Sequence, residues 1–168
     1  MSQKQTNIVI LLALLVIIIF VTLGFFGLGG FTVSGTSPNQ PAGDTSTQAL
    51  IDEIQKTGSV SDLRVQDLTI GSGDAVKEGD TLTVNYTGVL PDGTVFDASA
   101  NHGQPFTFTL GKDPVIKGWE QGVIGMKKGG RRLLAIPPSL GYGANAVGQI
   151  PPNSTLIFDV ELLDVVSN

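Results

Sequence analysis

The side chains that most often carry enzyme chemistry are scarce in this sequence. There is no cysteine, and the only histidine, His102, stands between Asn101 and Gly103, which predicts a solvated loop instead of a catalytic triad or a metal site. Asp159 and Glu161 alternate with apolar residues and are expected on a solvated strand face, not as a glycosidase pair. The sequence therefore predicts no metal, no cofactor and no nucleophile.

Charge and glycine patterns exclude two further classes of function. The formal net charge is −5, so nothing favours nucleic-acid binding. Gly71-Ser72-Gly73 lacks the downstream glycine and lysine of a phosphate-binding loop. Lys127, Lys128, Arg131 and Arg132 surround a turn and are interpreted as an ordinary charged hairpin end.

What the sequence does supply is a set of aromatic side chains. Those that follow Phe31 are Tyr86, Phe96, Phe106, Phe108, Trp119, Tyr142 and Phe158. Tyr86, Phe106 and Phe158 fall on the inward positions of segments that alternate with period two. This alternation predicts burial, and it does not distinguish a core from a binding pocket.

The elements that would hold these rings are short strands and one helix. The expected strands cover residues 63–70, 81–87, 105–110, 132–136 and 156–163, and glycine- and proline-containing turns separate them. A helix is expected over Lys117–Gly125, with Trp119 and Val123 on one face. Strands with one short helix packed on them predict an α+β architecture.

The aromatic residues stand in short motifs that follow one another in a definite order. The motifs are Val84-Asn85-Tyr86-Thr87-Gly88, Asp92-Gly93-Thr94-Val95-Phe96-Asp97, residues 105–111, Val115-Ile116-Lys117-Gly118-Trp119, Gly141-Tyr142-Gly143 and residues 150–162. Over residues 61–166 their order and spacing resemble the FKBP-type peptidyl-prolyl cis/trans isomerases. The resemblance implies an antiparallel sheet of five to six strands wrapped around one short helix.

The resemblance also implies one pocket and a role for each residue around it. Catalytic roles fall to Asp97, Tyr142, Ile116 and Tyr86, and substrate-binding roles fall to Phe96, Phe106, Val115, Trp119, Ile150 and Phe158. Trp119 would form the floor, the Tyr142 hydroxyl and the Ile116 N–H would bind substrate carbonyls, and Asp97 would favour the twisted amide. The partners implied are proline-containing polypeptides and macrolides such as rapamycin.

Three functions from different classes remain open at this point. The first is an isomerase that assists the folding of extracytoplasmic proteins. The second is a module that binds proline-containing segments with little turnover, and the third is a membrane-tethered chaperone. The loop at residues 144–149 is about one residue shorter than in familiar members of the family, and His102 and Pro114 stand where other members carry charges. These departures concern the rim of the pocket and hence substrate preference.

The first thirty residues form a separate unit. Residues 8–28 contain no charged residue and, as a helix, would rise about 30 Å, enough to cross a bilayer core. We favour a retained single-pass anchor over a cleaved signal peptide. Lys4 precedes the span and the first charge after it is Asp44, which predicts a cytoplasmic N-terminus and an extracytoplasmic catalytic domain.

The predicted organisation thus has three parts. Residues 1–30 would be the transmembrane anchor, and residues 61–166 the isomerase domain. Residues 31–60 would be a flexible linker, because their first part is rich in glycine, proline, serine and threonine. A short helix is expected within this linker over Ala49–Lys56.

Overall fold

The computed structural model describes residues 43–167 of the chain. The predicted membrane-spanning segment, residues 8–28, lies outside the described residues, as does the first part of the predicted linker. Between residues 43 and 167, no helix has both the length and the apolar character needed to cross a membrane. The predicted division at residues 30 and 60 stays a prediction.

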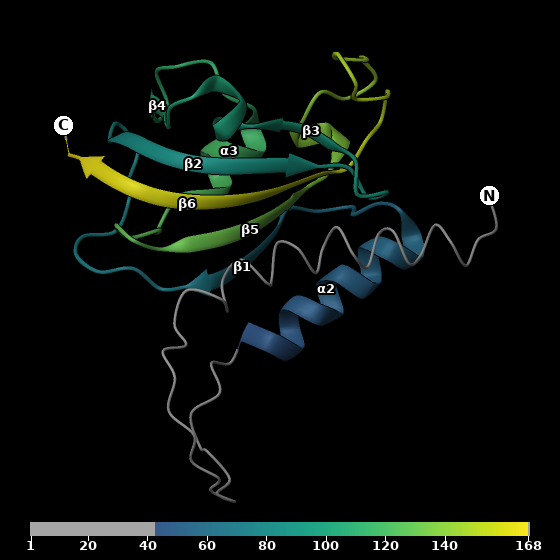
Figure 1. Cartoon of the computed structure of the whole chain (residues 1–168), viewed down its shortest axis with the longest axis horizontal. Coiled ribbons are helices and arrows are strands. Elements are labelled where there is room, and N and C mark those ends of the chain that lie inside the picture. The colour runs from purple at the N-terminus through teal and green to yellow at the C-terminus, as the bar shows by residue number, and fades with distance from the viewer. Residues whose placement is uncertain (1–42, 168) are drawn as a thin grey trace, which may run out of the picture. The chain divides into compact units, whose positions relative to one another are not determined.

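Six strands form one antiparallel sheet, as predicted (Figure 1). They are β1 (Arg64–Thr69), β2 (Thr81–Val89), β3 (Val95–Ala98), β4 (Phe106–Thr109), β5 (Arg131–Ile136) and β6 (Leu156–Val166). The strand order is β1-β5-β6-β2-β3, and β4 also pairs with β2. The long strand β6 therefore lies in the middle of the sheet, between β5 and β2.

One edge of β2 is shared between two strands, and this division shapes one end of the sheet. Residues 87–89 of β2 pair with β3, whereas residues 81–84 pair with β4. Between them the backbone N–H of Tyr86 donates to Ser99 Oγ at 3.1 Å instead of to a strand. The chain leaves the sheet through the 3-10 helix η1 (Ser99–His102), which begins directly after Ala98, the last residue of β3.

Alternation along the strands divides their side chains between two faces. The inner face carries the short helix α3 (Lys117–Gly122), which ends slightly earlier than predicted. On this face lies the inner core, whose strand residues include Leu82, Val84, Leu134, Ile136, Leu156, Phe158, Val160 and Leu162. Trp119 and Val123 extend this core from the helix side. The α+β architecture predicted from the sequence is confirmed.

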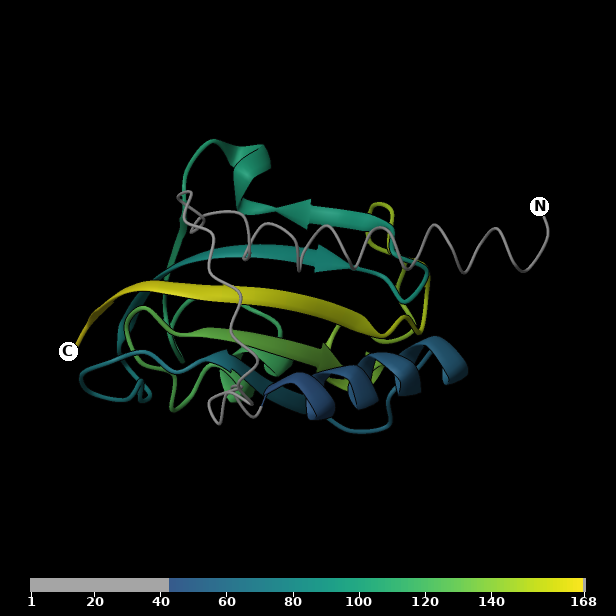
Figure 2. The ribbon, with the colours of Figure 1, turned by 60° about the horizontal axis from the view of Figure 1, so that its bottom comes forward.

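The outer face is covered by the helix α2 (Gly43–Thr57), which contains the predicted helix at residues 49–56 and is longer (Figure 2). Leu50 and Ile54 of α2 pack against Leu133, Ala135 and Ile157 of the sheet. These strand residues alternate with those of the inner core, so the two helices cover opposite faces.

The segment that follows α2 is tied to the same face. The backbone N–H of Val60 donates to the buried Thr155 Oγ1 at 3.1 Å, just before β6 begins. Because this bond joins residues far apart in the chain, it fixes the end of the α2 segment to the sheet. The helix α2 and the strands thus form one packed unit.

A substitution in α2 tests whether this packing contributes to stability. Ile54 is 3% exposed, so Ile54→Val should lower the free energy of unfolding by about 1 kcal/mol, the usual cost of one buried methylene group. Urea denaturation would measure the change, and the exposed Gln55→Ala is the control. Equal stability of the two variants would contradict this role.

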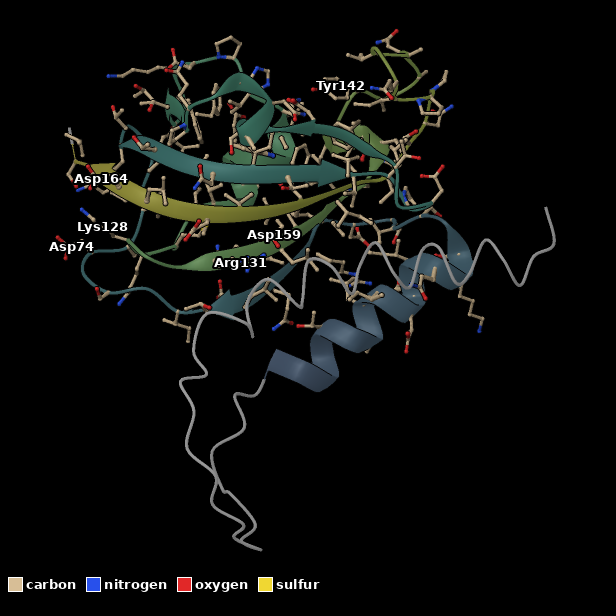
Figure 3. All side chains as sticks on the ribbon, in the orientation of Figure 1. Asp74, Lys128, Arg131, Tyr142, Asp159 and Asp164 are labelled. Atoms are coloured by element: carbon tan, nitrogen blue, oxygen red, sulfur yellow. The ribbon has the colours of Figure 1, made fainter. Side chains whose placement is uncertain are left out.

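Part of the outer face is polar, and here the interpretation of Asp159 as a solvated residue is wrong. Asp159 is only 8% exposed, because Arg131 Nε and Nη2 donate to its two carboxylate oxygens at 2.7 and 2.6 Å. These hydrogen bonds raise the pKa of Arg131. The predicted solvated strand face is therefore a largely buried ion pair at this position, visible on β5 and β6 in Figure 3.

The four cations near the turn before β5 also differ from one another. Lys128 makes an exposed ion pair with Asp164 at 2.6 Å, as expected of a charged hairpin end (Figure 3). Arg132, in contrast, is 8% exposed and pairs with Asp67 of β1. Lys128 therefore fits the predicted charged hairpin end, whereas the buried Arg132 does not.

Candidate active site

The aromatic residues singled out from the sequence gather around Trp119 on the inner face. The Trp119 ring lies edge-to-face with the rings of Tyr86 and Phe158, at centroid distances of 5.3 Å in each case. Phe106 lies 6.1 Å from Trp119, and Phe96 lies 5.4 Å from Phe158. Rings from β2, β3, β4, β6 and α3 therefore form one continuous aromatic cluster.

The cluster is graded from buried to exposed. Trp119, Phe158 and Ile150 are buried at its base. Around them lie five half-buried side chains: Tyr86, Phe96, Val115, Ile116 and Tyr142. Phe106 is the most open of the rings, at 39% exposed. Nine of the ten residues predicted for the site therefore lie in this cluster, and Trp119 is buried at its base.

Two glycines allow α3 to bring Trp119 this close to the sheet. A Cβ atom at Gly118 would lie 2.4 Å from Ile136 Cγ2, and one at Gly122 would lie 2.8 Å from Leu134 Cδ2. Because Ile136 and Leu134 are fully buried, neither can move away easily. Only glycine at these positions permits the observed approach of α3 to β5.

Arg132 holds the other end of this helix. Its Nη1 atom donates to the carbonyls of Gly122 and Ile124 at 2.8 and 2.9 Å. Its Nε and Nη2 atoms donate to the Asp67 carboxylate at 2.6 and 3.1 Å. The carbonyls at the end of a helix have no partner within the helix, so this guanidinium satisfies them and ties α3 to β1 through β5.

A single carboxylate, Asp97, lies beside the aromatic cluster. Its Oδ2 accepts from the Tyr86 hydroxyl at 2.6 Å, and its Oδ1 accepts from the backbone N–H of Ala98 at 2.9 Å. Its other partner is His102, whose Nε2 lies 2.9 Å from Oδ1. Three donors therefore converge on one side chain.

The electrostatics follow from these contacts. Burial alone would raise the pKa of Asp97, but the hydrogen bonds from Tyr86, His102 and Ala98 outweigh it and lower the pKa. For Tyr86, burial and the hydrogen bond to Asp97 both raise the pKa of the phenol far above its ordinary value. Asp97 is consequently a carboxylate at neutral pH, and Tyr86 is a neutral donor.

Two further donors predicted for the site are available to a ligand. Ile116 precedes the first turn of α3, and its N–H has no acceptor among residues 43–167. The Tyr142 hydroxyl likewise has no hydrogen-bond partner in the described part of the chain. Tyr142 follows the 3-10 helix η2 (Pro138–Leu140), at the end of the sheet opposite Lys128 and Asp164 (Figure 3).

His102 is the residue that the sequence interpretation missed. It is exposed, as expected, yet it contacts Asp97, which is five residues earlier. The contact requires η1 and the left-handed Gly103 that ends it at φ 71°. A signal was present in the sequence, because Asp97 and His102 are separated by little more than one turn of a helix.

The motifs can now be compared with known proteins. Residues 73–163 match the family model of the FKBP-type peptidyl-prolyl cis-trans isomerases. The chain belongs to this family. The FKBP resemblance noted in the sequence is therefore confirmed, and it covers every predicted site residue.

Individual relatives of this FKBP chain agree with the assignment. It is 54% identical over 104 residues to the FK506-binding protein of Neisseria meningitidis serogroup B, covering 61% of this chain and 95% of that protein. It is 46% identical over 136 residues to FK506-binding protein 4 of Aspergillus fumigatus, covering 81% of this chain. That match covers only 26% of the fungal protein, so the chain spans about a quarter of its length.

Solved structures show the same fold. The crystal structure of FkpA from Escherichia coli matches with a TM-score of 0.60 and 45% identity, over 73% of this chain and 60% of that one. The crystal structure of AtFKBP13 matches with a TM-score of 0.59 and 41% identity, over 64% and 96% of the two chains. The antiparallel six-stranded sheet with one short helix on its inner face is thus FKBP-like.

Proposed function

We propose that this FKBP chain is a peptidyl-prolyl cis/trans isomerase that accelerates rotation about X-Pro bonds in protein substrates. One arrangement carries the proposal: an aromatic cluster with Trp119 at its base lies beside the Asp97 carboxylate and the Ile116 and Tyr142 donors, which have no acceptor among residues 43–167. The cluster supplies an apolar surface for a proline ring. The donors and the carboxylate supply the few polar contacts that would orient the amide.

The reaction needs no nucleophile. Rotation about a peptide bond has a barrier of about 18–20 kcal/mol, because resonance gives the C–N bond double-bond character. At the twisted transition state this resonance is lost and the carbonyl becomes less polar, so a dry aromatic surface favours it over the planar amide. A thousandfold acceleration needs only about 4 kcal/mol of such preference.

Each part of the cluster has a role in this proposal. Trp119, Phe158, Phe106 and Val115 hold the proline ring, and Phe96 and Ile150 complete the apolar wall. The Ile116 N–H and the Tyr142 hydroxyl donate to substrate carbonyls. Because the Tyr86 hydroxyl already donates to Asp97, we assign Tyr86 to holding that carboxylate beside the substrate.

The names of the relatives suggest a second class of ligand. The proteins of Neisseria meningitidis and Aspergillus fumigatus are called FK506-binding proteins. We infer that macrolides such as FK506 and rapamycin bind this chain at the aromatic cluster and compete there with proline-containing peptides. Fluorescence of Trp119, the only tryptophan, would report such binding.

We also propose that residues 8–28 anchor the chain in a membrane, with the N-terminus in the cytoplasm and the catalytic domain outside. The support is their uncharged, apolar sequence and the lysine that precedes them. A C-terminal reporter that is active only outside the cytoplasm, combined with carbonate extraction of membranes, tests both statements. Recovery of the chain in the soluble fraction would refute the anchor.

The test of the activity is direct. The full-length chain in detergent micelles, and residues 43–168 alone, would be mixed with an Ala-Leu-Pro-Phe peptide, and isomerisation would be followed by NMR exchange. We expect saturable acceleration in both samples. A folded chain that binds the peptide without accelerating it would instead favour the proline-binding module. Suppression of aggregation without peptide turnover would favour the chaperone.

A further inference from the structure

The helix α3, which carries the base of the aromatic cluster, is too short to hold its own position. It has six residues, Lys117–Gly122, whereas isolated helices shorter than about 12–15 residues are only marginally stable in water. The helix begins after Ile116, and no side chain of the described residues caps its first turn. The position of Trp119 in the site therefore depends on the contacts that α3 makes with the rest of the fold.

The side-chain hydrogen bonds that hold α3 lie at its C-terminal end and come from Arg132. The Nη1 atom of Arg132 donates to the carbonyls of Gly122 and Ile124, while Nε and Nη2 donate to the Asp67 carboxylate on β1. Arg132 is only 8% exposed, so water competes little for these hydrogen bonds. None of its three partners belongs to the predicted site, so Arg132 can act on a substrate only through α3.

We propose that Arg132 is a positioning residue for the isomerase, because it fixes the two parts of the site that α3 carries, the Trp119 ring and the Ile116 N–H. This inference rests on the proposed function. The backbone of the helix links both parts to the held end. The Val123 N–H donates to the Trp119 carbonyl at 3.1 Å, and the Trp119 N–H donates to the Ile116 carbonyl at 2.9 Å. A shift of the last turn is therefore transmitted to the site.

The chain that follows α3 has a separate attachment. The Gly125 N–H donates to the Val76 carbonyl at 3.0 Å, and the Val76 N–H donates to the Met126 carbonyl at 2.8 Å. Neither bond involves Arg132, so its loss should loosen the last turn of α3 and leave the segment after it in place. Because a misplacement of about 1 Å can reduce a rate about a hundredfold, a small movement of the helix should be measurable.

The expected effect of Arg132→Met is a rise in KM. The Trp119 ring and the Ile116 N–H contact the substrate before rotation as well as during it, so displacing them weakens binding in both states. We expect KM to rise about five- to tenfold and kcat to change less than about twofold. A purely structural role predicts the opposite, because partial unfolding reduces the amount of active enzyme and hence the apparent kcat, but leaves KM unchanged. NMR exchange of the Ala-Leu-Pro-Phe peptide with the full-length chain in micelles would measure both constants.

Two further substitutions separate the position of the helix from the stability of the fold. Asp67→Asn leaves Arg132 its two helix carbonyls and removes the charge that pairs with it. This variant should be less stable than the wild type, with KM within about twofold of the wild-type value. Arg132→Lys cannot reach the helix carbonyls and Asp67 together, so it should raise KM by less than Arg132→Met. It takes the place of Arg132→Met if that variant is incompletely folded.

A second readout does not depend on activity. Trp119 is the only tryptophan, and its buried Nε1 has no hydrogen-bond partner among the described residues, so its indole ¹H–¹⁵N resonance reports the packing around α3. This resonance should shift in Arg132→Met and stay in place in Asp67→Asn and in Lys128→Met. An unshifted resonance, a wild-type KM in Arg132→Met, or an equal rise of KM in Asp67→Asn would overturn the inference.

Failure of the proposed function gives a different result. If the wild-type chain is folded but shows no turnover, the proposed function fails, whatever the variants do. The indole resonance and the affinity for the peptide, measured by NMR titration, then still decide whether Arg132 sets the position of Trp119.

Discussion

Replacing the Asp97 carboxylate by the amide of asparagine should lower kcat/KM about tenfold and leave the fold intact. Asparagine has nearly the same shape, but it has only one side-chain oxygen, so the substitution removes the negative charge and also one of the two acceptor atoms that Tyr86, Ala98 and His102 share. A tenfold loss corresponds to about 1.4 kcal/mol of transition-state stabilisation, close to the lower limit of what one hydrogen bond to a charged group contributes.

The effect should grow when a second polar group is removed. Tyr142→Phe deletes a hydroxyl that has no partner among residues 43–167, so it should cost activity without costing stability. Because Tyr142 is assigned to a substrate carbonyl and Asp97 to the twisted amide, the two losses should add, and the double variant should lose about a hundredfold. A double variant no worse than Asp97→Asn alone would mean that the Tyr142 hydroxyl does not bind substrate.

The control for this series removes a charge elsewhere. Glu161 is exposed on the outer face of β6, so Glu161→Gln makes the same chemical change on the face of the sheet opposite the aromatic cluster. It should have unaltered kcat/KM. Near-ultraviolet circular dichroism would verify that all the variants are folded. If Glu161→Gln reduced activity as much as Asp97→Asn, the loss would reflect overall charge and not the site.

Arg132→Met should lower the free energy of unfolding by about 2–4 kcal/mol, the largest effect on stability that we predict. The substitution leaves the carbonyls of Gly122 and Ile124 without their donor and removes the partner of Asp67. Breaking a buried ion pair costs about 3–5 kcal/mol, but Asp67 is half-exposed and can be hydrated, which reduces the cost.

Urea denaturation would measure this change, with an unaltered slope indicating that the unfolded states are comparable. The matched control is Lys128→Met, which breaks the exposed ion pair with Asp164 and should change stability little. Arg132→Lys is a second comparison, because it keeps the charge but cannot reach the helix carbonyls and Asp67 together. If Arg132→Met were as stable as the Lys128→Met control, the guanidinium would not hold α3.

The sequence alone was sufficient to predict many of the residues that form the inner face of the sheet. Strands such as β2 and β6 bury every second residue on the inner face. Hydrophobic alternation therefore showed that inward-pointing side chains include Leu82, Val84, Phe158 and Val160. The order of the FKBP motifs then identified which of the inward residues surround Trp119. Both signals are local, because they depend on short stretches of chain and on their spacing.

The contacts that sequence reasoning missed all join elements whose approach depends on the complete sheet. Alternation placed Asp159 on the outer face but could not reveal that Arg131 pairs with it and buries it. The apolar face of α2 packs on β5 and β6, which the C-terminal part of the chain forms. Its partner therefore could not be identified from the sequence of α2 alone.

The same reason applies at the candidate active site. Asp97 and Tyr142 were predicted from their motifs, whose order and spacing resemble those of the FKBP family. The charge environment of Asp97 could not be predicted in this way, since it depends on how β3 leaves the sheet and how η1 turns His102 back toward Asp97. Side-chain identity is written in the sequence, whereas a contact between two side chains exists only once the backbone between them has a definite path.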